Sequence, residues 1–204
     1  MGIIKQTDLD AVNQAIQAVE QTTDAELVAV LAHQADDYRY IPTLWAALVA
    51  LFVPGVVWFI GWWLDTLELL LMQLSVFIVM TLVLRAPVIM YRLIPTRVSR
   101  WRAANLARRQ FLENNLHCTK AESGVLIFIA EAEHYVEIIA DRGINQHVPQ
   151  QQWQQIVDQF TTAIKRGHTQ QGLIECIQSC GELLAEHIPA TGEKNELPNH
   201  LVVI

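Results

Sequence analysis

Lysine and arginine are absent from residues 40–84, and the only acidic residues in this stretch are Asp65 and Glu68. The scarcity of charge leaves two long apolar runs, of 21 residues from Leu44 to Leu64 and of 16 residues from Leu69 to Leu84. A 21-residue helix is about 31 Å long, close to the thickness of the hydrocarbon core of a bilayer. We therefore predict a transmembrane helical hairpin over residues 41–91, with spans at about 44–64 and 69–85.

A buried helical hairpin of a soluble protein is the alternative interpretation of these runs. Tryptophans favour the membrane, because amphipathic rings prefer the headgroup region and four of them lie toward the ends of the first run: Trp45, Trp58, Trp62 and Trp63. Pro54-Gly55 in the middle of the run is tolerated in a membrane helix. The second run spans the bilayer only if Arg85 snorkels or if Ala86–Tyr91 continue the helix.

Basic residues are just as unevenly distributed elsewhere in the chain. Residues 1–84 carry two bases and nine acids, residues 85–112 carry seven arginines and no acid, and residues 113–204 carry five bases and twelve acids. This pattern excludes a uniformly basic nucleic-acid binder and is typical of a segment at a membrane surface. Because bases stay on the cytoplasmic side, we predict a multi-pass protein of a bacterial inner membrane with both termini in the cytoplasm.

Signals of secretion are also missing. Residues 1–20 have no apolar signal-peptide core, and the three cysteines, Cys118, Cys176 and Cys180, are typical of a reducing compartment. Cys176 and Cys180 are four residues apart on a predicted helix, where they are either two small buried thiols or a metal or redox pair.

Around the apolar hairpin the periodicity predicts an α/β domain. Helices are expected from about residue 9 to 19, 95 to 116, 149 to 166 and 169 to 187, and strands over 25–32, 124–130 and 134–141. The short connection at 131–133 favours an antiparallel hairpin, and Gly143 is available for a positive φ after it.

The strand at 25–32 is not stable alone, so we expect it to pair with the 124–141 hairpin. The membrane hairpin is then an insertion into one α/β domain, formed by residues 1–40 and 92–189. Residues 190–204 are predicted to be a flexible tail, although their last four residues are apolar and able to dock.

Arginines and tryptophans are the candidates for contact with lipid. They are Arg85, Arg92, Arg97, Arg100, Arg102, Trp62 and Trp63. In the basic helix the expected apolar side is formed by Val98, Trp101, Ala104, Ala107 or Leu106, Phe111 and Leu112. The helix is either an ordinary domain helix with a solvated charged face or in direct contact with anionic lipid.

Recognisable catalytic motifs are absent: there is no phosphate-binding glycine loop, no HExxH and no Cys-x₅-Arg. The remaining candidate acids and ligands are Glu26, Asp36, Asp37, Glu131, Glu133, His134, Glu137, Asp141 and His147. Asp36, Asp37 and Asp141 would hold a divalent cation such as Ca²⁺ if the fold brings them together, and otherwise form a solvated loop and a turn. His134 is either a ligand or acid–base group or a half-exposed edge residue.

Two stretches resemble the TPM-domain membrane proteins, a family named after a plant thylakoid lumen protein, a photosystem II repair protein and a nematode receptor auxiliary subunit. The first stretch is Glu20–Val30 with Ala35–Pro42, and the second is Thr119–Pro149, continued at Gly167–Gly181. The resemblance implies a small α/β/α sandwich around a mixed sheet. It also implies one of several activities, since members are described as acid phosphatases, as divalent-cation-binding domains and as helpers of membrane-protein complexes.

Three functions follow from the residues and the resemblance together. The first is a non-catalytic accessory or assembly protein that acts in a membrane complex, beside a membrane protein or as a homo-oligomer, through a cytoplasmic domain. The second is a divalent-metal-dependent phosphatase, and the third is a module that senses cations or lipid. Membrane lipids are expected partners, and nucleic acid is not.

Overall fold

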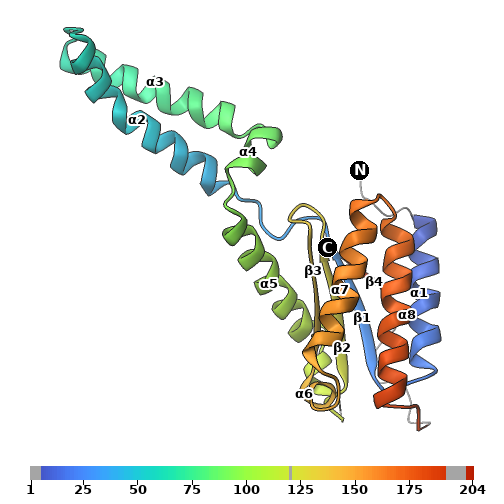
Figure 1. Cartoon of the computed structure of the whole chain (residues 1–204). Helices are drawn as coiled ribbons and strands as arrows, with labels where there is room; N and C mark the ends of the chain where they lie inside the picture. The colour runs from blue at the N-terminus through green and yellow to red at the C-terminus, as the bar shows by residue number, and fades with distance from the viewer. Residues whose placement is uncertain (1–5, 120, 192–200) are drawn as a thin grey trace. The chain divides into compact units, whose positions relative to one another are not determined.

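The computed structural model describes residues 6–119, 121–191 and 201–204. The chain divides into two compact units (Figure 1). The sheet unit is formed by Met1–Ala35 and Arg100–Ile204, and the helical unit is formed by Asp36–Ser99. The chain thus leaves the sheet unit after Ala35 and returns to it at Arg100.

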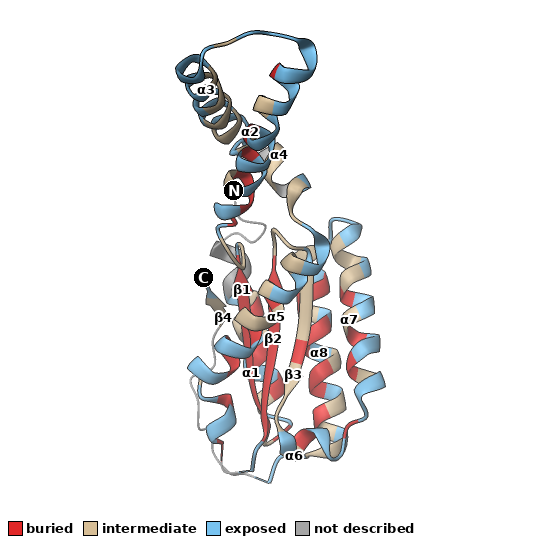
Figure 2. Cartoon of the chain, turned by 90° about the vertical axis from the view of Figure 1, so that its left-hand side faces the viewer, coloured by how far each residue is buried: buried red, intermediate tan, exposed pale blue. Residues whose placement is uncertain are grey.

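A four-stranded mixed sheet forms the centre of the sheet unit. Its strands are β1 (Glu26–Ala32), β2 (Gly124–Ala130), β3 (Tyr135–Ala140) and β4 (Leu201–Val203), in the order β3-β2-β1-β4. β1 runs parallel to β2 and to β4, whereas β2 and β3 are antiparallel. Every residue of β1 and β2 is buried (Figure 2), as expected for strands covered on both faces. The predicted pairing of the first strand with the later hairpin is confirmed.

Helices cover both faces of this sheet (Figure 1). On one face lie α1 (Gln6–Glu20), α7 (Gln150–Lys165) and α8 (Thr169–His187), which bury residues such as Ile16, Trp153 and Ile177 against the sheet. On the other face lies α5 (Thr96–Glu113). Ala103 and Ala107 are fully buried there, and their small side chains let the helix approach the strands closely.

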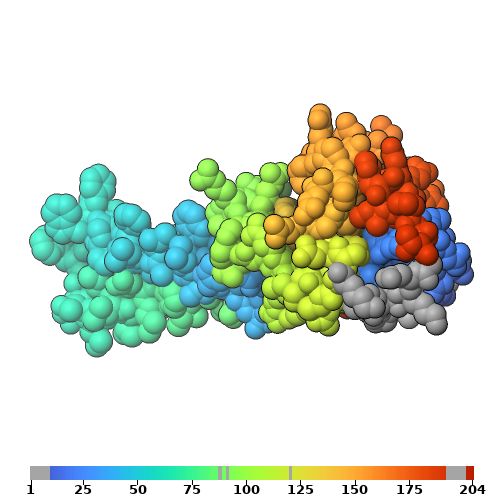
Figure 3. Space-filling view, turned by 90° about the horizontal axis from the view of Figure 1, so that it is seen from below, coloured from blue at the N-terminus to red at the C-terminus, as the bar shows by residue number. Residues whose placement is uncertain are grey.

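The helical unit contains two long apolar helices, α2 (Tyr40–Ile60) and α3 (Thr66–Leu84), and the short α4 (Pro87–Leu93). α2 and α3 lie side by side (Figure 3). Ala46, Ala50 and Val57 of α2 are buried, and small residues at such positions are common where apolar helices pack closely. No residue of α3 is buried.

The connection between α2 and α3 differs from the sequence prediction. α2 ends four residues earlier than the predicted span, because Gly61 adopts a left-handed conformation with φ of 76° and terminates the helix. Thr66–Glu68, predicted as the turn, belong to α3 instead. Asp65 caps this helix by accepting the Thr66 N–H at 2.8 Å, while the Glu68 carboxylate accepts the Asp65 N–H at 3.2 Å.

The second apolar helix ends at Leu84, close to the predicted end at 85, and of the two alternatives for its end the continuation through Ala86–Tyr91 is not observed. Ala86 is held out of the helical region by the following Pro87, with ψ of 128°. Pro87 then occupies the first turn of the separate helix α4. α3 is therefore about 28 Å long, at 1.5 Å for each of its 19 residues.

Two details of the basic helix also need correction. α5 ends at Glu113, after which Asn115 adopts a φ of 56° and a 3₁₀ turn, η1, covers Leu116–Cys118. Trp101 and Leu112, predicted on the buried side of the helix, are 58% and 55% exposed. Gln110 is buried in their place, together with Phe111.

Gly143 has a different role from the predicted one, since it does not adopt a positive φ. It lies in the short helix α6 (Arg142–Asn145), which Asp141 caps by accepting the Arg142 N–H at 2.7 Å. A Cβ at this position would collide with the backbone carbonyls of Ala121 and Glu122. Glycine is thus required here by a close approach of two backbone segments.

The C-terminal end forms a strand that the sequence analysis did not predict. Leu201–Val203 pair with Ala29–Leu31 of β1, and the Leu201 N–H donates to Asn13 Oδ1 at 2.8 Å. Of the two alternatives for the last four residues, docking is observed and a flexible tail is not, while residues 192–200 lie outside the described part of the chain. A run of four apolar residues is too short to show a period in the sequence.

Candidate functional site

The turn between β2 and β3 gathers polar side chains at one end of the sheet, where β1 and β2 both finish. The Glu131 carboxylate lies 3.2 Å from His33 Nδ1, and Glu133 accepts the Ala35 N–H at 3.0 Å. The backbone supports this contact, because the Glu131 N–H donates to the Ala32 carbonyl at 2.9 Å. The turn is therefore bonded to Ala32, His33 and Ala35, in the segment through which the chain leaves the sheet unit.

His134 occupies the last position of this turn. The sequence pattern predicts His134 at the start of a strand, but β3 begins at Tyr135 and His134 has a φ of 49°. This left-handed conformation is uncommon for a residue with a Cβ, and histidine is among the side chains that tolerate it best. The imidazole is exposed and lies beside the cavity described next.

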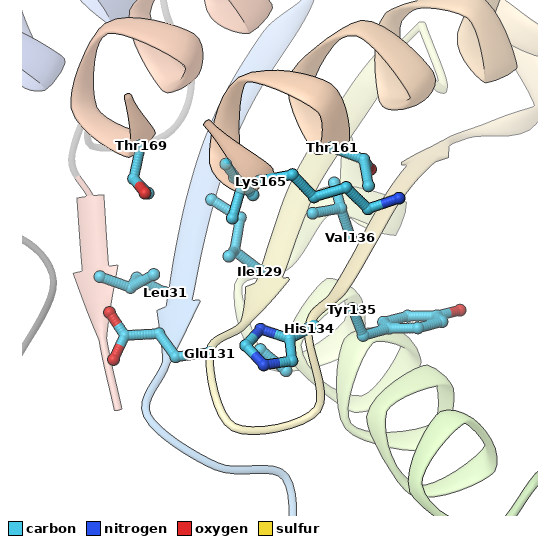
Figure 4. A pocket seen from close by; sticks show the side chains of 11 residues that line it. Leu31, Ile129, Glu131, His134, Tyr135, Val136, Thr161, Lys165 and Thr169 are labelled. Carbon is cyan, nitrogen blue, oxygen red and sulfur yellow. The ribbon is translucent and has the colours of Figure 1, made fainter. Parts of the chain in front are cut away.

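A cavity of about 420 Å³ opens at this end of the sheet (Figure 4), and we call it the strand-end cavity. Its apolar lining comes from the strand ends and α7. Polar groups of the turn, of α7 and of the start of α8 complete it. The lining residues are Leu31, Ile129, Ala130, Glu131, His134, Tyr135, Val136, Thr161, Ile164, Lys165 and Thr169.

A second cavity of about 420 Å³ lies along β3, the strand at the edge of the sheet, and is mostly polar. Arg100, Glu137 and Asp158 bring charges of both signs to its wall. Trp153 also lines it and is only 2% exposed, and its Nε1 has no hydrogen-bond partner among the described residues. His134 and Thr161 line both cavities, so the two are neighbours.

Tyr135 and Glu137 form a hydrogen-bonded pair on β3. The Tyr135 hydroxyl donates to Glu137 Oε2 at 3.0 Å. Burial first, and then the negative charge of Glu137, raise the pKa of Tyr135 from 10.0 to about 12. The phenol therefore keeps its proton at neutral pH and acts as a hydrogen-bond donor.

The structure separates the candidate acids and ligands that the sequence analysis named. Glu131, Glu133 and His134 come together at the strand ends, whereas Glu137 lies along β3. Glu26 and Asp141 lie at the opposite end of the sheet, since Glu26 begins β1 and Asp141 follows β3. His147 is exposed after α6.

The three aspartates predicted to bind a cation lie in different units. Asp36 and Asp37 begin the helical unit, and Asp141 caps α6 in the sheet unit. Among the described residues, no group of three or more His, Cys, Asp or Glu side chains has an arrangement suited to a metal ion. The calcium site formed by the three aspartates stays a prediction.

The residues expected at the lipid surface are largely exposed. Trp62 and Trp63 lie between α2 and α3 and are 62% and 99% exposed. Four of the arginines are exposed as well, namely Arg85, Arg92, Arg97 and Arg100. Arg102 is half-buried, and its guanidinium lies 5.1 Å from the ring centroid of Trp101, as in a cation–π contact. Their contact with lipid stays a prediction.

Cys176 and Cys180 are both buried and reduced on α8, whereas Cys118 is exposed. The hydrogen bond with Cys176, together with burial, raises the pKa of Cys180 well above its ordinary value. A raised pKa keeps the thiol protonated, which favours the interpretation as small core residues over the redox pair.

Glu20, at the end of α1, is an acid whose pKa is raised in the fold. Its Oε1 accepts the Leu27 N–H at 3.2 Å, and burial raises its pKa from 4.5 to about 8, with a smaller contribution from the charge of Glu26. The folded state therefore binds this proton more tightly than the unfolded chain. The resulting stability is present below about pH 4.5 and is lost as the pH rises to about 8.

Replacing Glu20 with Gln is expected to make the chain more stable at pH 8.5 and to leave its stability at pH 4 nearly unchanged. We expect the free energy of unfolding to rise by about 1–2 kcal/mol at pH 8.5. This is less than the full pKa shift would give, because the side chain is only half-buried and solvent screens its charge. Thermal unfolding of both variants across this pH range measures the effect. Asp10→Asn, at an exposed acid on the same helix, is the control, and an equal gain in that variant would refute the assignment to Glu20.

Several residues at this end of the sheet were missed from the sequence. Thr161, Lys165 and Thr169 line the cavity and His33 contacts Glu131, and all four come from segments that are far from the β2–β3 turn in the chain. Lys165 is in the last turn of α7, where a base is expected from the helix dipole alone. No local pattern could distinguish it from an ordinary surface lysine.

Known proteins match the fold of this chain and part of its sequence. Residues 88–183 match the model of the TPM domain. The structure resembles the NMR structure of the BA42 protein from the psychrophilic bacterium Bizionia argentinensis, with a TM-score of 0.61 and 19% identity over 98% of this chain and 94% of that one. This likeness shows a shared fold. No curated protein matches the sequence. Residues 88–183 thus match the TPM domain, which confirms the predicted resemblance for its second stretch, Thr119–Pro149 with Gly167–Gly181.

Proposed function

We propose that the chain is a multi-pass membrane protein whose TPM-type domain serves, without catalysis, as an accessory or assembly module in the cytoplasm. In this proposal α2 and α3 cross the bilayer as a hairpin, and the sheet unit receives them as an insertion between β1 and α5. The partner is a membrane protein or a second copy of the same chain. The membrane is the inner membrane of a bacterium.

The exposed apolar surface of the helical unit is the observation that carries the proposal. α2 and α3 are both long and apolar enough to cross a bilayer. The buried core helix of a soluble protein passes the same test of length, but here no residue of α3 is buried. Leu70, Leu74 and Leu82 are each more than half exposed. A surface of this kind is stable in contact with lipid and is a liability in water.

Charge supports the proposed orientation. Four exposed arginines follow α3 within about 15 residues of its end: Arg85, Arg92, Arg97 and Arg100. The turn between α2 and α3 has no base and presents Trp62 and Trp63. By the positive-inside rule the arginine side stays in the cytoplasm, and aromatic rings favour the interface on the other side.

The exposed face of α5 supports a partner-binding role. Trp101 and Leu112 are separated by eleven residues, about three helical turns, so they lie on the same face of the helix. Both are more than half exposed, although they are large and apolar. Tryptophan is enriched among residues that dominate binding at interfaces. We assign this pair to the surface that contacts the partner.

Extraction of the tagged full chain from membranes into polymer-bounded lipid discs tests the accessory role. The expected result is a disc that holds, beside one 23.1 kDa chain, either a second membrane protein or further copies of the chain. Trp101→Ala combined with Leu112→Ala is expected to dissociate this particle at least tenfold more readily. The fold is retained, since both side chains are exposed.

The matched control is Gln178→Ala with Glu182→Ala, an exposed pair on α8. The control is expected to leave the particle intact. Recovery of the wild-type chain only as a monomer would contradict the accessory role. Hydrolysis of a generic phosphoester by that monomer with a divalent ion would support the phosphatase instead.

A further inference from the structure

The strand-end cavity has an apolar floor at the carboxyl ends of two parallel strands. Leu31 is the last residue but one of β1, and Ile129 lies beside it on β2. Val136 of β3 and Ile164 of α7 complete the apolar walls. Such a floor favours hydrocarbon over water, and the carboxyl end of parallel strands is a common position for ligand sites.

The two sides of this cavity differ in charge at the rim. Figure 4 shows Lys165 and Thr161 on one side and Glu131 with His134 on the opposite side, with Ile129 between them. The Glu131 carboxylate is held by His33 at 3.2 Å and is only 9% exposed. A ligand with one negative group would therefore orient that group toward Lys165 and away from Glu131.

The start of α8 reinforces the basic side. Thr169, the first residue of α8, lines the cavity, and the preceding His168 makes no capping hydrogen bond with its side chain. The first N–H groups of any helix have no partner inside it and favour a negative charge. Thr169 and Lys165 thus both line the cavity, and the Lys165 side chain extends toward Thr161 (Figure 4).

The size of the cavity limits the ligand. At roughly 30 Å³ for each water-sized group, about 420 Å³ holds on the order of fourteen heavy atoms. We propose that the strand-end cavity binds a free single-chain carboxylate of about twelve carbons. Its chain lies on Leu31, Ile129, Val136 and Ile164, and its carboxylate meets Lys165 and the start of α8. This binding site is independent of the accessory role proposed above.

Photolabelling tests the site in the full chain, held in discs of zwitterionic phospholipid. The probe is a twelve-carbon fatty acid with a diazirine at its methyl end, and mass spectrometry maps the labelled peptides. We expect label on the peptides that contain Ile129, Val136 and Ile164, and we expect an excess of lauric acid to remove it. The same probe with an alcohol in place of the carboxylate is expected to label these peptides at least tenfold less.

Two charge reversals complete the experiment. Lys165→Glu is expected to lower labelling about tenfold, because it removes a charge-assisted hydrogen bond and adds repulsion. Arg166→Glu, the next residue and an exposed one outside the cavity lining, is the control and is expected to leave labelling unchanged. Thermal unfolding checks that both variants fold.

Three results would overturn the proposal. They are label confined to α2 and α3, equal label from the alcohol probe, and equal loss of label in the two charge variants. Label confined to α2 and α3 would mean that the probe only dissolves in the lipid around the hairpin. The outcome of the accessory-complex experiment does not affect this test.

Discussion

A fragment of residues 100–204 is expected to remain unfolded, although it contains most of the stretch that matches the TPM domain. The reason is the position of β1, which lies between β2 and β4 and is buried at all seven residues. The fragment also lacks α1, whose Val12 and Ile16 are fully buried. Removing a single large core side chain costs about 2–5 kcal/mol of stability. Because the fragment lacks all the core side chains of β1 and α1, its total loss exceeds the free energy of unfolding of a typical domain, roughly 5–15 kcal/mol.

The matched protein for comparison joins residues 1–35 to residues 100–204 through a flexible linker of about ten residues. This linked chain retains every strand and the helices of both sheet faces, and it is expected to unfold in urea in one cooperative transition. Circular dichroism of the two proteins makes the comparison. Cooperative unfolding of the 100–204 fragment alone would contradict the proposal that the hairpin is an insertion into one domain.

Arginine at the centre of α3 is expected to prevent insertion into the membrane. Leu74 and Ile78 are near the middle of this helix and are 54% and 49% exposed. Each arginine at a helix centre costs roughly 2.5–3.5 kcal/mol on the insertion scale, so Leu74→Arg with Ile78→Arg costs about 5–7 kcal/mol. The double variant is expected to appear in the alkaline carbonate extract, whereas the wild-type chain stays in the membrane pellet.

Leu67→Arg provides the control for depth, because Leu67 lies in the first turn of α3, beside Asp65. An arginine there reaches the interface at little cost, so this variant is expected to stay in the pellet. If the double variant pelleted as completely as the wild-type chain, α3 would not be a membrane span. If Leu67→Arg and the double variant both appeared in the carbonate extract, the depth of the arginine in the membrane would not explain the loss of insertion.

Regular elements with a strong period could be predicted from the sequence. β2 was predicted over 124–130 and α8 over 169–187, and the structure has both at these residues. Long runs of buried residues and a regular apolar stripe specify such elements locally. The pairing of β1 followed from elementary stability, since a lone strand has no partner for its backbone groups.

Helix ends and short strands could not be predicted as well. α2 ends at the left-handed Gly61, although the apolar run continues to Leu64, and α3 starts at the cap formed by Asp65, before the second apolar run begins. The Leu201–Val203 strand gains its stability from β1, which is far away in the sequence. Trp101 and Leu112 were placed on the wrong side of α5, because Ala103, Ala107 and Phe111 are the residues that pack on the sheet.

The site was predictable only in part. Glu131 and His134 stood out as a local cluster of polar residues, but His33 and Lys165 join them only through the fold. The three-aspartate site was conditional on the fold bringing Asp36, Asp37 and Asp141 together, which no local pattern specifies. β3 runs antiparallel to β2, which places Asp141 at the opposite end from the end of β1.

Thiol labelling of intact cells tests the membrane account most directly. The natural Cys118 is exposed in the sheet unit, and Cys176 and Cys180 are buried. In a Cys118→Ser background, Trp63→Cys places one accessible thiol between α2 and α3. A membrane-impermeant maleimide is expected to label position 63 in intact cells and to label Cys118 of the wild-type chain only after permeabilisation. Labelling of Cys118 in intact cells, with position 63 protected, would contradict the account.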